Sequence, residues 1–302
     1  MTADLLAEAL TTFGAVPTAA ARPADARSGA GVHRVRTSTG TLAYLKVTPA
    51  ALGEVALAGA GRELRFYERL APTVPVAAPV LLDALRGPAG IALLLSDAGA
   101  TRPPSGWTDR DWTRLGRDLA LLHAAPAPQS DWTRTDSLRA ALADPDLDRI
   151  RAFWSPVLPS LESLLTNRDR IAARLDARPS HLVHGDCHTG NIVHAEHGLA
   201  FCDWQSTGLG RAASDLAFLS VRAAPAGVEV PAALVDAYLA HRPADPAAFR
   251  RAVLLEELAV YVFEWPAFAA YNDATGIGRV QSRAAVLADR LGEMGEPTGS
   301  LR

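Results

Sequence analysis

The stretch "LVHGDCHTGNIVHAEHGLAFCDW", residues 182–204, contains a crowded polar loop followed by two short apolar runs. The loop at 184–191 holds two His, one Asp, one Cys and one Asn. The apolar runs at 192–194 and 199–202 are separated by a turn that contains Glu-His-Gly. Two such runs around a short Gly-containing turn predict a β-hairpin, and we expect it to be centred on His197.

A hairpin centred on His197 brings three oxygen-bearing side chains to one of its ends. Asn191 falls opposite Asp203, and Asp186 lies on the loop that enters the first strand. Amide and carboxylate oxygens suit Mg²⁺, which commonly also takes phosphate oxygens as ligands. A further carboxylate can orient a hydroxyl group and accept its proton. The stretch therefore predicts a phosphoryl-transfer site in which Asn191 and Asp203 hold the metal and Asp186 acts on the acceptor.

The composition is that of a globular protein. The 302 residues are 49% hydrophobic and 21% charged, with a formal net charge of −3, which gives no reason to expect nucleic acid or an anionic membrane as a partner. No apolar run approaches the roughly 20 residues that span a bilayer, and nothing resembles a secretory signal. The two cysteines, Cys187 and Cys202, cannot form a disulfide framework. We expect a cytoplasmic protein, and its oligomeric state stays open.

Lysine usage draws attention to one position. Of 30 basic residues, 29 are Arg and the single Lys is Lys46. A chain so rich in Arg suggests that Lys46 needs a compact ammonium rather than a planar guanidinium. Lys46 lies in the second of two strand-like runs, 32–35 and 42–47, which flank a turn at 37–40. A Gly-containing turn before the first run, above a strand Lys, is one way to hold a polyphosphate. The candidate phosphate-binding residues are Ser28, Gly29, Gly31 and Lys46.

An amphipathic helix is expected after these strands. Apolar residues near helical spacing run through 52–71. We expect Glu63 on this helix to pair with Lys46 and orient its ammonium, with Glu54 and Glu68 as alternatives.

The rest of the chain is less rich in strand-like runs. A buried strand-like run at 91–95 breaks into small and polar residues, which predicts a hinge. Beyond it, helical segments are expected at 112–125, 158–177, 234–240 and 249–271. The predicted fold class is α+β with two lobes. A small β-rich lobe is expected over 1–96, and a larger, mainly helical lobe over 97–302.

Three motifs resemble the aminoglycoside phosphotransferase and choline kinase-like family, which has the protein-kinase-like fold. They are HxDxxxxN at 184–191, the Asp of "CDW" at 202–204, and "DLAFL" at 215–219. "FYERLAP" and "CDWQ" also resemble the ecdysteroid kinase-like branch. The resemblance covers most of the chain. It implies transfer of the γ-phosphate of ATP (or GTP), with Mg²⁺, to a hydroxyl of a small molecule. Such acceptors include aminoglycosides, amino sugars, choline-like alcohols and other hydroxylated metabolites or antibiotics. If the acceptor is an antibiotic, the resemblance implies a role in antibiotic resistance.

The resemblance assigns roles to residues of the nucleotide site. Lys46 and Glu63 match the family's strand Lys and helix Glu. "LLLSDAG" at 93–99 resembles the nucleotide-binding hinge, which implies adenine contacts from the backbone around Ser96 and Ala98.

The resemblance also assigns roles in the loop and hairpin. Asp186 matches the catalytic Asp, Asn191 and Asp203 match the metal ligands, and Asp215 matches an Asp that supports the catalytic loop. The chain departs from the family's pattern in its weakly matching Gly-rich loop. It also departs at Trp204, where many relatives have Phe or Leu.

Other classes of function fit the residues less well. Five of the eight His fall between 181 and 197, but their spacing fits no closed set of zinc ligands. Only eleven residues separate Asp203 from Asp215, too few for a long segment that docks a polypeptide substrate. A nucleotide-binding pseudokinase or regulatory module without turnover is the alternative. It would be expected to have lost one of four residues that are all present: Lys46, Asp186, Asn191 and Asp203.

The resemblance implies that the lobe at 1–96 binds the nucleotide and that the lobe at 97–302 carries catalysis and acceptor binding, so the acceptor site is sought in the helical lobe. The segment 254–273 places Glu257, Tyr261 and Glu264 on one helical stripe, with Trp265 beside it. Such an acidic and aromatic wall could bind a cationic acceptor such as an amino sugar or a quaternary amine. The opposite interpretation, a solvated Glu face with the aromatic rings in the core, is equally open, so the acceptor is not identified.

Overall fold

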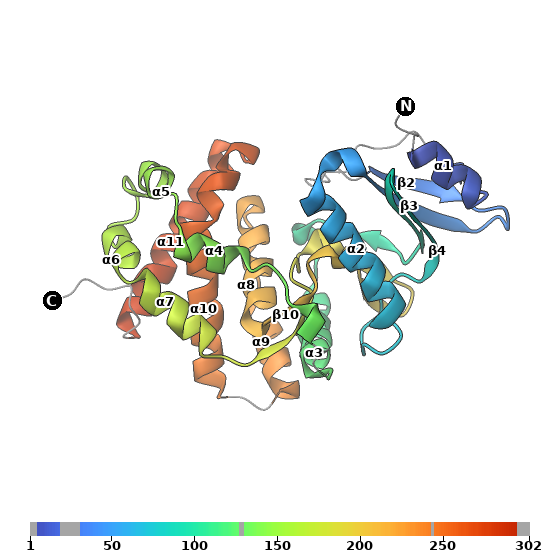
Figure 1. Ribbon diagram of the computed structural model, residues 1–302. Coiled ribbons are helices and arrows are strands. Elements are labelled where there is room, and N and C mark those ends of the chain that lie inside the picture. The colour runs from blue at the N-terminus through green and yellow to red at the C-terminus, as the bar shows by residue number, and fades with distance from the viewer. Residues whose placement is uncertain (1–4, 19–30, 127–129, 243–244, 295–302) are drawn as a thin grey trace. The chain divides into compact units, whose positions relative to one another are not determined.

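The computed structural model describes residues 5–18, 31–126, 130–242 and 245–294. The chain divides into two compact units, of which the first is Met1–Thr101 with Ile192–Thr207 and the second is Arg102–Asn191 with Gly208–Arg302. The first unit contains most of the strands and the second most of the helices (Figure 1). The expected α+β class, with a β-rich part and a mainly helical part, is confirmed. The lobe boundary after residue 96 stays a prediction.

The first unit is built on a five-stranded antiparallel sheet in the order β1-β2-β3-β5-β4. Its strands are β1 (Val16–Pro17), β2 (Gly31–Arg36), β3 (Leu42–Pro49), β4 (Leu81–Gly87) and β5 (Gly90–Ser96). β2, β3 and β5 confirm the three strand-like runs of this region. β4 was not predicted, because its residues do not alternate between apolar and polar types.

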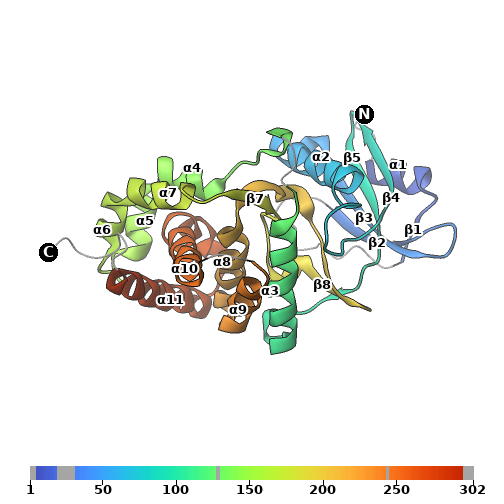
Figure 2. The same cartoon turned by 90° about the horizontal axis from the view of Figure 1, so that it is seen from below.

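Side-chain alternation along β3 separates the two faces of this sheet. Ala43, Leu45 and Val47 form a hydrophobic core with α1 (Leu5–Thr12) on one face. The predicted helix 52–71 is present as α2 (Glu54–Arg69), which covers the opposite face. Figure 2 shows the sheet between these two helices. The side chain of a residue such as Lys46 therefore points towards α2.

The predicted hairpin is present in the first unit, but with a different register. β6 (Ala100–Thr101), β8 (Ile192–Ala195) and β9 (Gly198–Phe201) form a small antiparallel sheet. Ala195 pairs with Gly198, so the turn consists of Glu196 and His197. The expected centre on His197 was therefore wrong, because a two-residue turn moves the centre of the ladder between these two residues.

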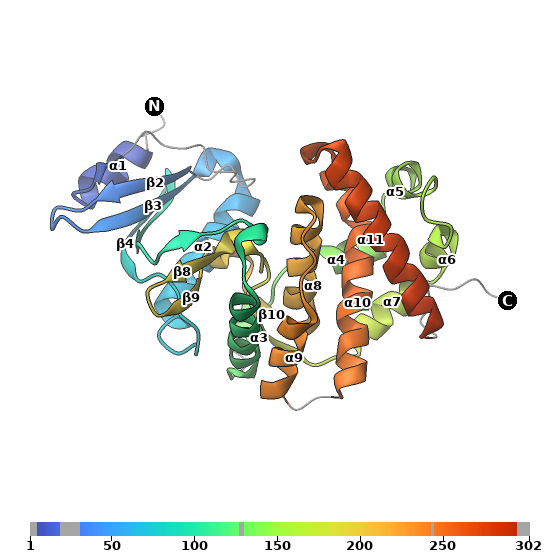
Figure 3. The same ribbon diagram turned by 180° about the vertical axis from the view of Figure 1, so that it is seen from behind.

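The second unit is a helical assembly with one small sheet. Its helices are α3 (Asp109–Ala124), α4 (Ser137–Ala143), α5 (Leu147–Trp154), α6 (Leu161–Thr166), α7 (Arg168–Asp176), α8 (Ala212–Ala223), α9 (Ala232–His241), α10 (Pro246–Phe263) and α11 (Ala274–Glu293). β7 (Ser180–Val183) pairs antiparallel with β10 (Gly208–Arg211). α10 packs against both α8 and α11 and lies between them (Figure 3). None of the described helices combines the length and the apolar character that a membrane span needs.

Two predicted helices of this unit are shorter than expected. The segment 158–177 is broken at Asn167, whose side-chain amide donates to a backbone carbonyl in the last turn of α6 at 2.9 Å. The segment 249–271 is α-helical only to Phe263 and then becomes a 3₁₀ segment. Pro266 has no amide hydrogen and disfavours continuation of the α-helix.

α3 and α9 lie side by side (Figure 2), and Gly116 of α3 is at their contact. A Cβ atom at Gly116 would lie 2.1 Å from the backbone oxygen of Leu234. We expect Gly116→Ala to lower the free energy of unfolding by about 1–3 kcal/mol, as overpacking typically does, although Ala favours helices more than Gly. Denaturant unfolding measures the change. Gly278→Ala in α11 is the matched control, because nothing lies within 4 Å of its added Cβ. Equal effects of both variants would contradict the close-approach explanation.

Candidate active site

Lys46 lies on β3 with its ammonium between two carboxylates. Its Nζ donates to Glu63 Oε2 and to Asp203 Oδ1, each at 2.6 Å. Glu63 is buried on α2, whereas Glu54 and Glu68 on the same helix are exposed. The ion pair expected between Lys46 and Glu63 is thus present, and Asp203 is a second partner.

The two carboxylates keep the Lys46 ammonium charged. Burial lowers the pKa of Lys46, but the negative charges of Glu63 and Asp203 outweigh that effect, so the net pKa is raised. The Lys46 side chain retains only 11% of its exposure. Its positive charge is therefore permanent, oriented and poorly hydrated, which suits attraction of an anionic ligand.

Asp203 has an unusual backbone conformation. Its φ is 62° and ψ 65°, and among the described non-glycine residues it is the one with a positive φ. The next residue, Trp204, is fully buried and stacks on Phe66 of α2 with ring centroids 3.8 Å apart. Its indole Nε1 also donates to the backbone oxygen of Phe201 at 2.8 Å. A left-handed residue persists where its surroundings hold it, so the Trp204 anchor helps to keep Asp203 in place.

The Gly-containing turn is only partly described. Gly31 opens β2 opposite Val47, one residue from the position opposite Lys46. Ser28 and Gly29 lie outside the described residues. The role of all three in phosphate binding stays a prediction.

The two predicted hinge residues differ in the hydrogen bonds they already make. The Ser96 amide donates to the backbone oxygen of Val80 at 2.9 Å, and the Ser96 hydroxyl accepts from the Val80 amide at 2.9 Å. Within the described part of the chain, Ala98 makes no backbone hydrogen bond. The backbone groups of Ala98 are therefore less engaged than those of Ser96.

Asp186 and Asn191 lie together in the loop that follows β7. The Asn191 side-chain Nδ2 donates to the Asp186 backbone oxygen at 2.9 Å and to Asp186 Oδ2 at 3.1 Å. With Nδ2 used in this way, Asn191 Oδ1 makes no hydrogen bond within the described residues. The loop thus presents a carboxylate and an amide oxygen close to one another.

Asp215 in the first turn of α8 fixes this loop through hydrogen bonds to its backbone. Its buried carboxylate accepts from the amides of His184 and Gly185 at 2.8 and 2.9 Å. His123 Nε2 on α3 also donates to it at 3.1 Å. Burial raises the pKa of Asp215, but these hydrogen bonds outweigh it and lower the net pKa, so the group is ionised.

His123 is the supporting residue that sequence reasoning missed. It is buried, and its Nδ1 shares a hydrogen bond of 3.1 Å with the Tyr238 hydroxyl, which fixes the ring for its bond to Asp215. The available signal was a His on the apolar side of the predicted helix 112–125.

The two cysteines are not poised as nucleophiles. Burial raises the pKa of Cys187 well above its usual range, and burial raises the pKa of Cys202 to about 12. Cys187 is completely buried and packs as a small side chain.

The predicted acceptor wall is not open in the structure. Glu257 is buried and forms a two-point ion pair with Arg283 of α11, at 2.8 and 3.0 Å. Tyr261 and Trp265 belong to the hydrophobic core of the helical unit, and Glu264 is half-buried. The aromatic rings lie in the core, as the second interpretation has it, but Glu257 is buried rather than solvated, and the four residues do not form a surface together.

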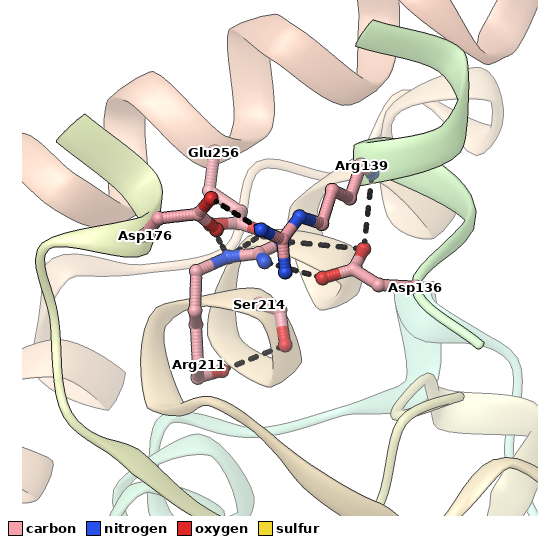
Figure 4. A network of polar contacts seen from close by, with 6 residues as sticks. All are labelled: Asp136, Arg139, Asp176, Arg211, Ser214 and Glu256. Atoms are coloured by element: carbon pink, nitrogen blue, oxygen red, sulfur yellow. Dashed lines mark hydrogen bonds and ion pairs between the residues drawn. The ribbon is translucent and has the colours of Figure 1, made fainter. Parts of the chain in front are cut away.

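A second ionic cluster joins several elements of the helical unit (Figure 4). The Arg211 guanidinium donates to Glu256 of α10, with the shortest contact at 2.6 Å, and also to Asp136. Asp136 caps α4 through the Arg139 amide at 3.2 Å, and Arg139 pairs with Asp176 of α7 at 3.0 Å. The cluster fastens β10, α10, α4 and α7 to one another.

Comparison with known proteins places the chain in a family. A family model described as a phosphotransferase enzyme family matches residues 23–251, which is well over half of the chain. The chain belongs to this phosphotransferase family. The expected resemblance to aminoglycoside and choline kinase-like phosphotransferases is confirmed. No curated protein matches the chain significantly.

Solved structures show that the phosphotransferase fold extends over nearly all of the chain. A macrolide 2′-phosphotransferase type I has a TM-score of 0.61 at 19% identity, covering 93% of this chain and 95% of that one. The amicoumacin kinase hAmiN, in complex with AMP-PNP, Ca²⁺ and Ami, has a TM-score of 0.59 at 14% identity, with coverages of 98% and 95%. An aminoglycoside phosphotransferase from Streptomyces rimosus, in complex with ADP and streptomycin, has a TM-score of 0.54 at 21% identity, with coverages of 84% and 96%. At these identities the likeness concerns the fold.

Proposed function

We propose that this phosphotransferase-family protein transfers the γ-phosphate of ATP (or GTP) to a hydroxyl group of a small molecule. The observation that carries the proposal is the Lys46 ammonium, held at 2.6 Å by both Glu63 and Asp203. A buried, permanently charged ammonium fixed by two carboxylates is a ready phosphate ligand. The nucleotides present in the amicoumacin kinase and Streptomyces rimosus structures support the same conclusion.

The nucleotide is proposed to use residues of the sheet unit. Lys46 binds phosphate oxygens, Glu63 orients Lys46, and Ala98 bonds the nucleobase through its backbone. Gly31 and its preceding turn cover the phosphates. Lys46 supplies a charged ammonium from β3, Glu63 a buried carboxylate from α2, and Ala98 a backbone amide without a backbone partner among the described residues.

The proposed metal is Mg²⁺, with Asp203 and Asn191 as ligands. A carboxylate and an amide oxygen are hard donors of the kind that Mg²⁺ prefers, and Asn191 Oδ1 is not used in the loop's own hydrogen bonds. When bound, the ion would neutralise charge on the phosphates.

Asp186 is proposed as the residue that acts on the acceptor. Its Oδ2 accepts a hydrogen bond from Asn191 Nδ2. The backbone just before it is fixed because the Gly185 amide donates to the Asp215 carboxylate. It accepts the hydroxyl proton and aims the oxygen at the γ-phosphorus. The acceptor site itself is not assigned, because the predicted wall is buried.

An acceptor screen tests the proposed function. The full chain is incubated with MgATP or MgGTP and a panel of aminoglycosides, macrolides, ethanolamine, choline and amino sugars, and nucleoside diphosphate release is followed. Mass spectrometry of the products separates acceptor phosphorylation from autophosphorylation. Acceptor-dependent release supports the proposal. Nucleotide binding without release by any acceptor would favour the pseudokinase alternative.

An arginine at position 46 should not replace Lys46 as the proposed phosphate ligand, so Lys46→Arg is expected to lose activity. The guanidinium is longer and planar, so it cannot occupy the point between Glu63 and Asp203 that the ammonium fills at 2.6 Å from each. We expect kcat/KM for ATP to fall by about 10²-fold or more, as for loss of one fixed electrostatic contact. Steady-state kinetics measure the fall, and thermal unfolding shows that the variant is folded. Near wild-type kcat/KM would exclude Lys46 as a phosphate ligand.

A further inference from the structure

A series of buried polar contacts links α9 to the loop that carries Asp186. The Tyr238 hydroxyl of α9 and His123 Nδ1 of α3 share a hydrogen bond of 3.1 Å. On the other side of the same ring, His123 Nε2 bonds Asp215 Oδ2 of α8, also at 3.1 Å. Each of these three residues is only 1% exposed, so water does not compete for the two bonds.

The protonation of the two outer groups fixes what the His123 ring must do. Burial raises the pKa of Asp215, but its hydrogen bonds outweigh that effect, so the carboxylate is ionised and can only accept. His123 Nε2 therefore carries a proton. Burial raises the pKa of Tyr238 to about 12, although the nearby Arg242 opposes the rise, so the hydroxyl keeps its proton. The hydroxyl can then donate to Nδ1 of a neutral ring or accept from Nδ1 of a charged one.

The far end of this series holds the backbone of the loop. Asp215 Oδ2, to which His123 donates, also accepts from the His184 amide at 2.8 Å. The other oxygen, Oδ1, accepts from the Gly185 amide at 2.9 Å. Asp186 follows directly, and its amide donates to His184 Nδ1 at 3.3 Å. A shift of the His123 ring would therefore move the carboxylate that fixes the two residues before Asp186.

The position of Tyr238 depends on the close contact between α9 and α3. Leu234 lies one turn before Tyr238 on the same face of α9. Gly116 lies two turns before His123 on the same face of α3, and an added Cβ there would lie 2.1 Å from the Leu234 backbone oxygen. The Tyr238 ring also stacks on Phe249 of α10, with centroids 4.7 Å apart. The helix contact and the hydrogen bond to His123 are thus parts of one interface.

We propose that Tyr238 is a positioning residue for the loop that carries Asp186. Its hydroxyl fixes the His123 ring, and the ring fixes the Asp215 carboxylate that holds the loop. The inference rests on the proposed function, in which Asp186 acts on the acceptor. Without the hydroxyl, the buried Nδ1 loses its partner, and the ring is free to tilt towards another one. The loop amides then lose a fixed acceptor, and Asp186 no longer meets the acceptor hydroxyl in one position.

Tyr238→Phe removes the hydroxyl and keeps the ring that stacks on Phe249. We expect the single-turnover rate with MgATP and the fastest acceptor of the screen to fall by about 10- to 100-fold, as misplacement of a reacting group does, while the Kd for ATP stays nearly unchanged. Val280→Ala, in the buried core of α11, is the control for lost stability. It should lower the free energy of unfolding but leave the rate unchanged. A wild-type rate in Tyr238→Phe would overturn the proposal.

A double variant tests whether the hydroxyl acts through His123. His123→Gln keeps an amide donor near the position of Nε2 but lacks the ring nitrogen that bonds Tyr238. In that background, Tyr238→Phe should cause little further loss of rate. Losses that multiply would mean that the hydroxyl acts by another route, and the proposal would be wrong.

Gly116→Ala tests the helix contact from a position two turns away from the hydrogen bond. Its Cβ would force α9 from α3, so the rate should fall as in Tyr238→Phe. Gly278→Ala, whose added Cβ meets nothing within 4 Å, should keep the wild-type rate. Equal rates in the two glycine variants would contradict the dependence of the loop on this contact.

Amide hydrogen exchange measures the anchoring of the loop without turnover, which separates failure of this inference from failure of the proposed function. In Tyr238→Phe, followed by NMR without ligands, the amides of His184 and Gly185 should exchange about 10-fold faster than in Val280→Ala. Equal exchange in the two variants would overturn the inference even in an active enzyme. The expected difference beside a wild-type protein that phosphorylates no acceptor would count against the proposed function, while the anchoring of the loop by Tyr238 would stand.

Discussion

Asp186→Asn lowers kcat by about 10² to 10⁴, while the Kd for nucleotide changes by no more than a few-fold. The substitution keeps the size of the side chain and one oxygen, but it removes the charge that is proposed to accept the hydroxyl proton. The loop should survive, because Asn191 also bonds the backbone oxygen of residue 186 and Asp215 holds the amide of Gly185. Chemistry is therefore expected to suffer far more than binding.

The measurement pairs calorimetric ATP affinity with the single-turnover rate on the same preparation. Asp203→Ala is the informative comparison, since loss of a proposed metal ligand should weaken nucleotide binding in the presence of Mg²⁺. A large loss of affinity in Asp186→Asn with little change in the chemical step would make Asp186 a nucleotide or metal residue. The division of roles proposed for the loop would then be wrong.

Arg211→Ala lowers the free energy of unfolding by about 3–5 kcal/mol, as removal of one partner from a buried ion pair typically does. The Arg211 side chain is 9% exposed and that of Glu256 2%, so truncation leaves the Glu256 carboxylate buried without its cation. Asp136 loses the same partner at the start of α4 (Figure 4). We expect the helices that the cluster joins to loosen together.

Chemical denaturation of the full chain measures this loss. Arg151→Ala is the matched control, because Arg151 forms a two-point pair with Glu162 at the surface and its removal should change stability little. The double variant Arg211→Met with Glu256→Leu tests the cause. Replacing two members of the cluster by apolar residues should recover part of the loss. A deficit that is as small for Arg211→Ala as for Arg151→Ala would contradict the role of burial.

The sequence was most informative where one element carries its own signal. Alternating apolar residues predicted β2 and β3, helical spacing predicted α2, and two apolar runs predicted the hairpin β8–β9, because these patterns depend on local geometry. The pair of Lys46 and Glu63 could also be proposed, since a strand followed by a helix brings nearby segments together. Local patterns do not set the register of a ladder, which explains the shift of the hairpin centre by half a residue.

Tertiary structure alone decided which polar groups meet. Glu257 and Tyr261 looked like a binding surface because helical spacing puts them on one stripe, but that stripe faces α11 and the core. His123 reaches Asp215 from a helix 92 positions away in sequence, and Arg211 joins Asp136 and Glu256 across 75 and 45 positions. The sequence alone thus predicted several local elements and the pair of Lys46 and Glu63. Only packing decided the partners of the other polar groups, because burial and pairing depend on which distant segments share a face.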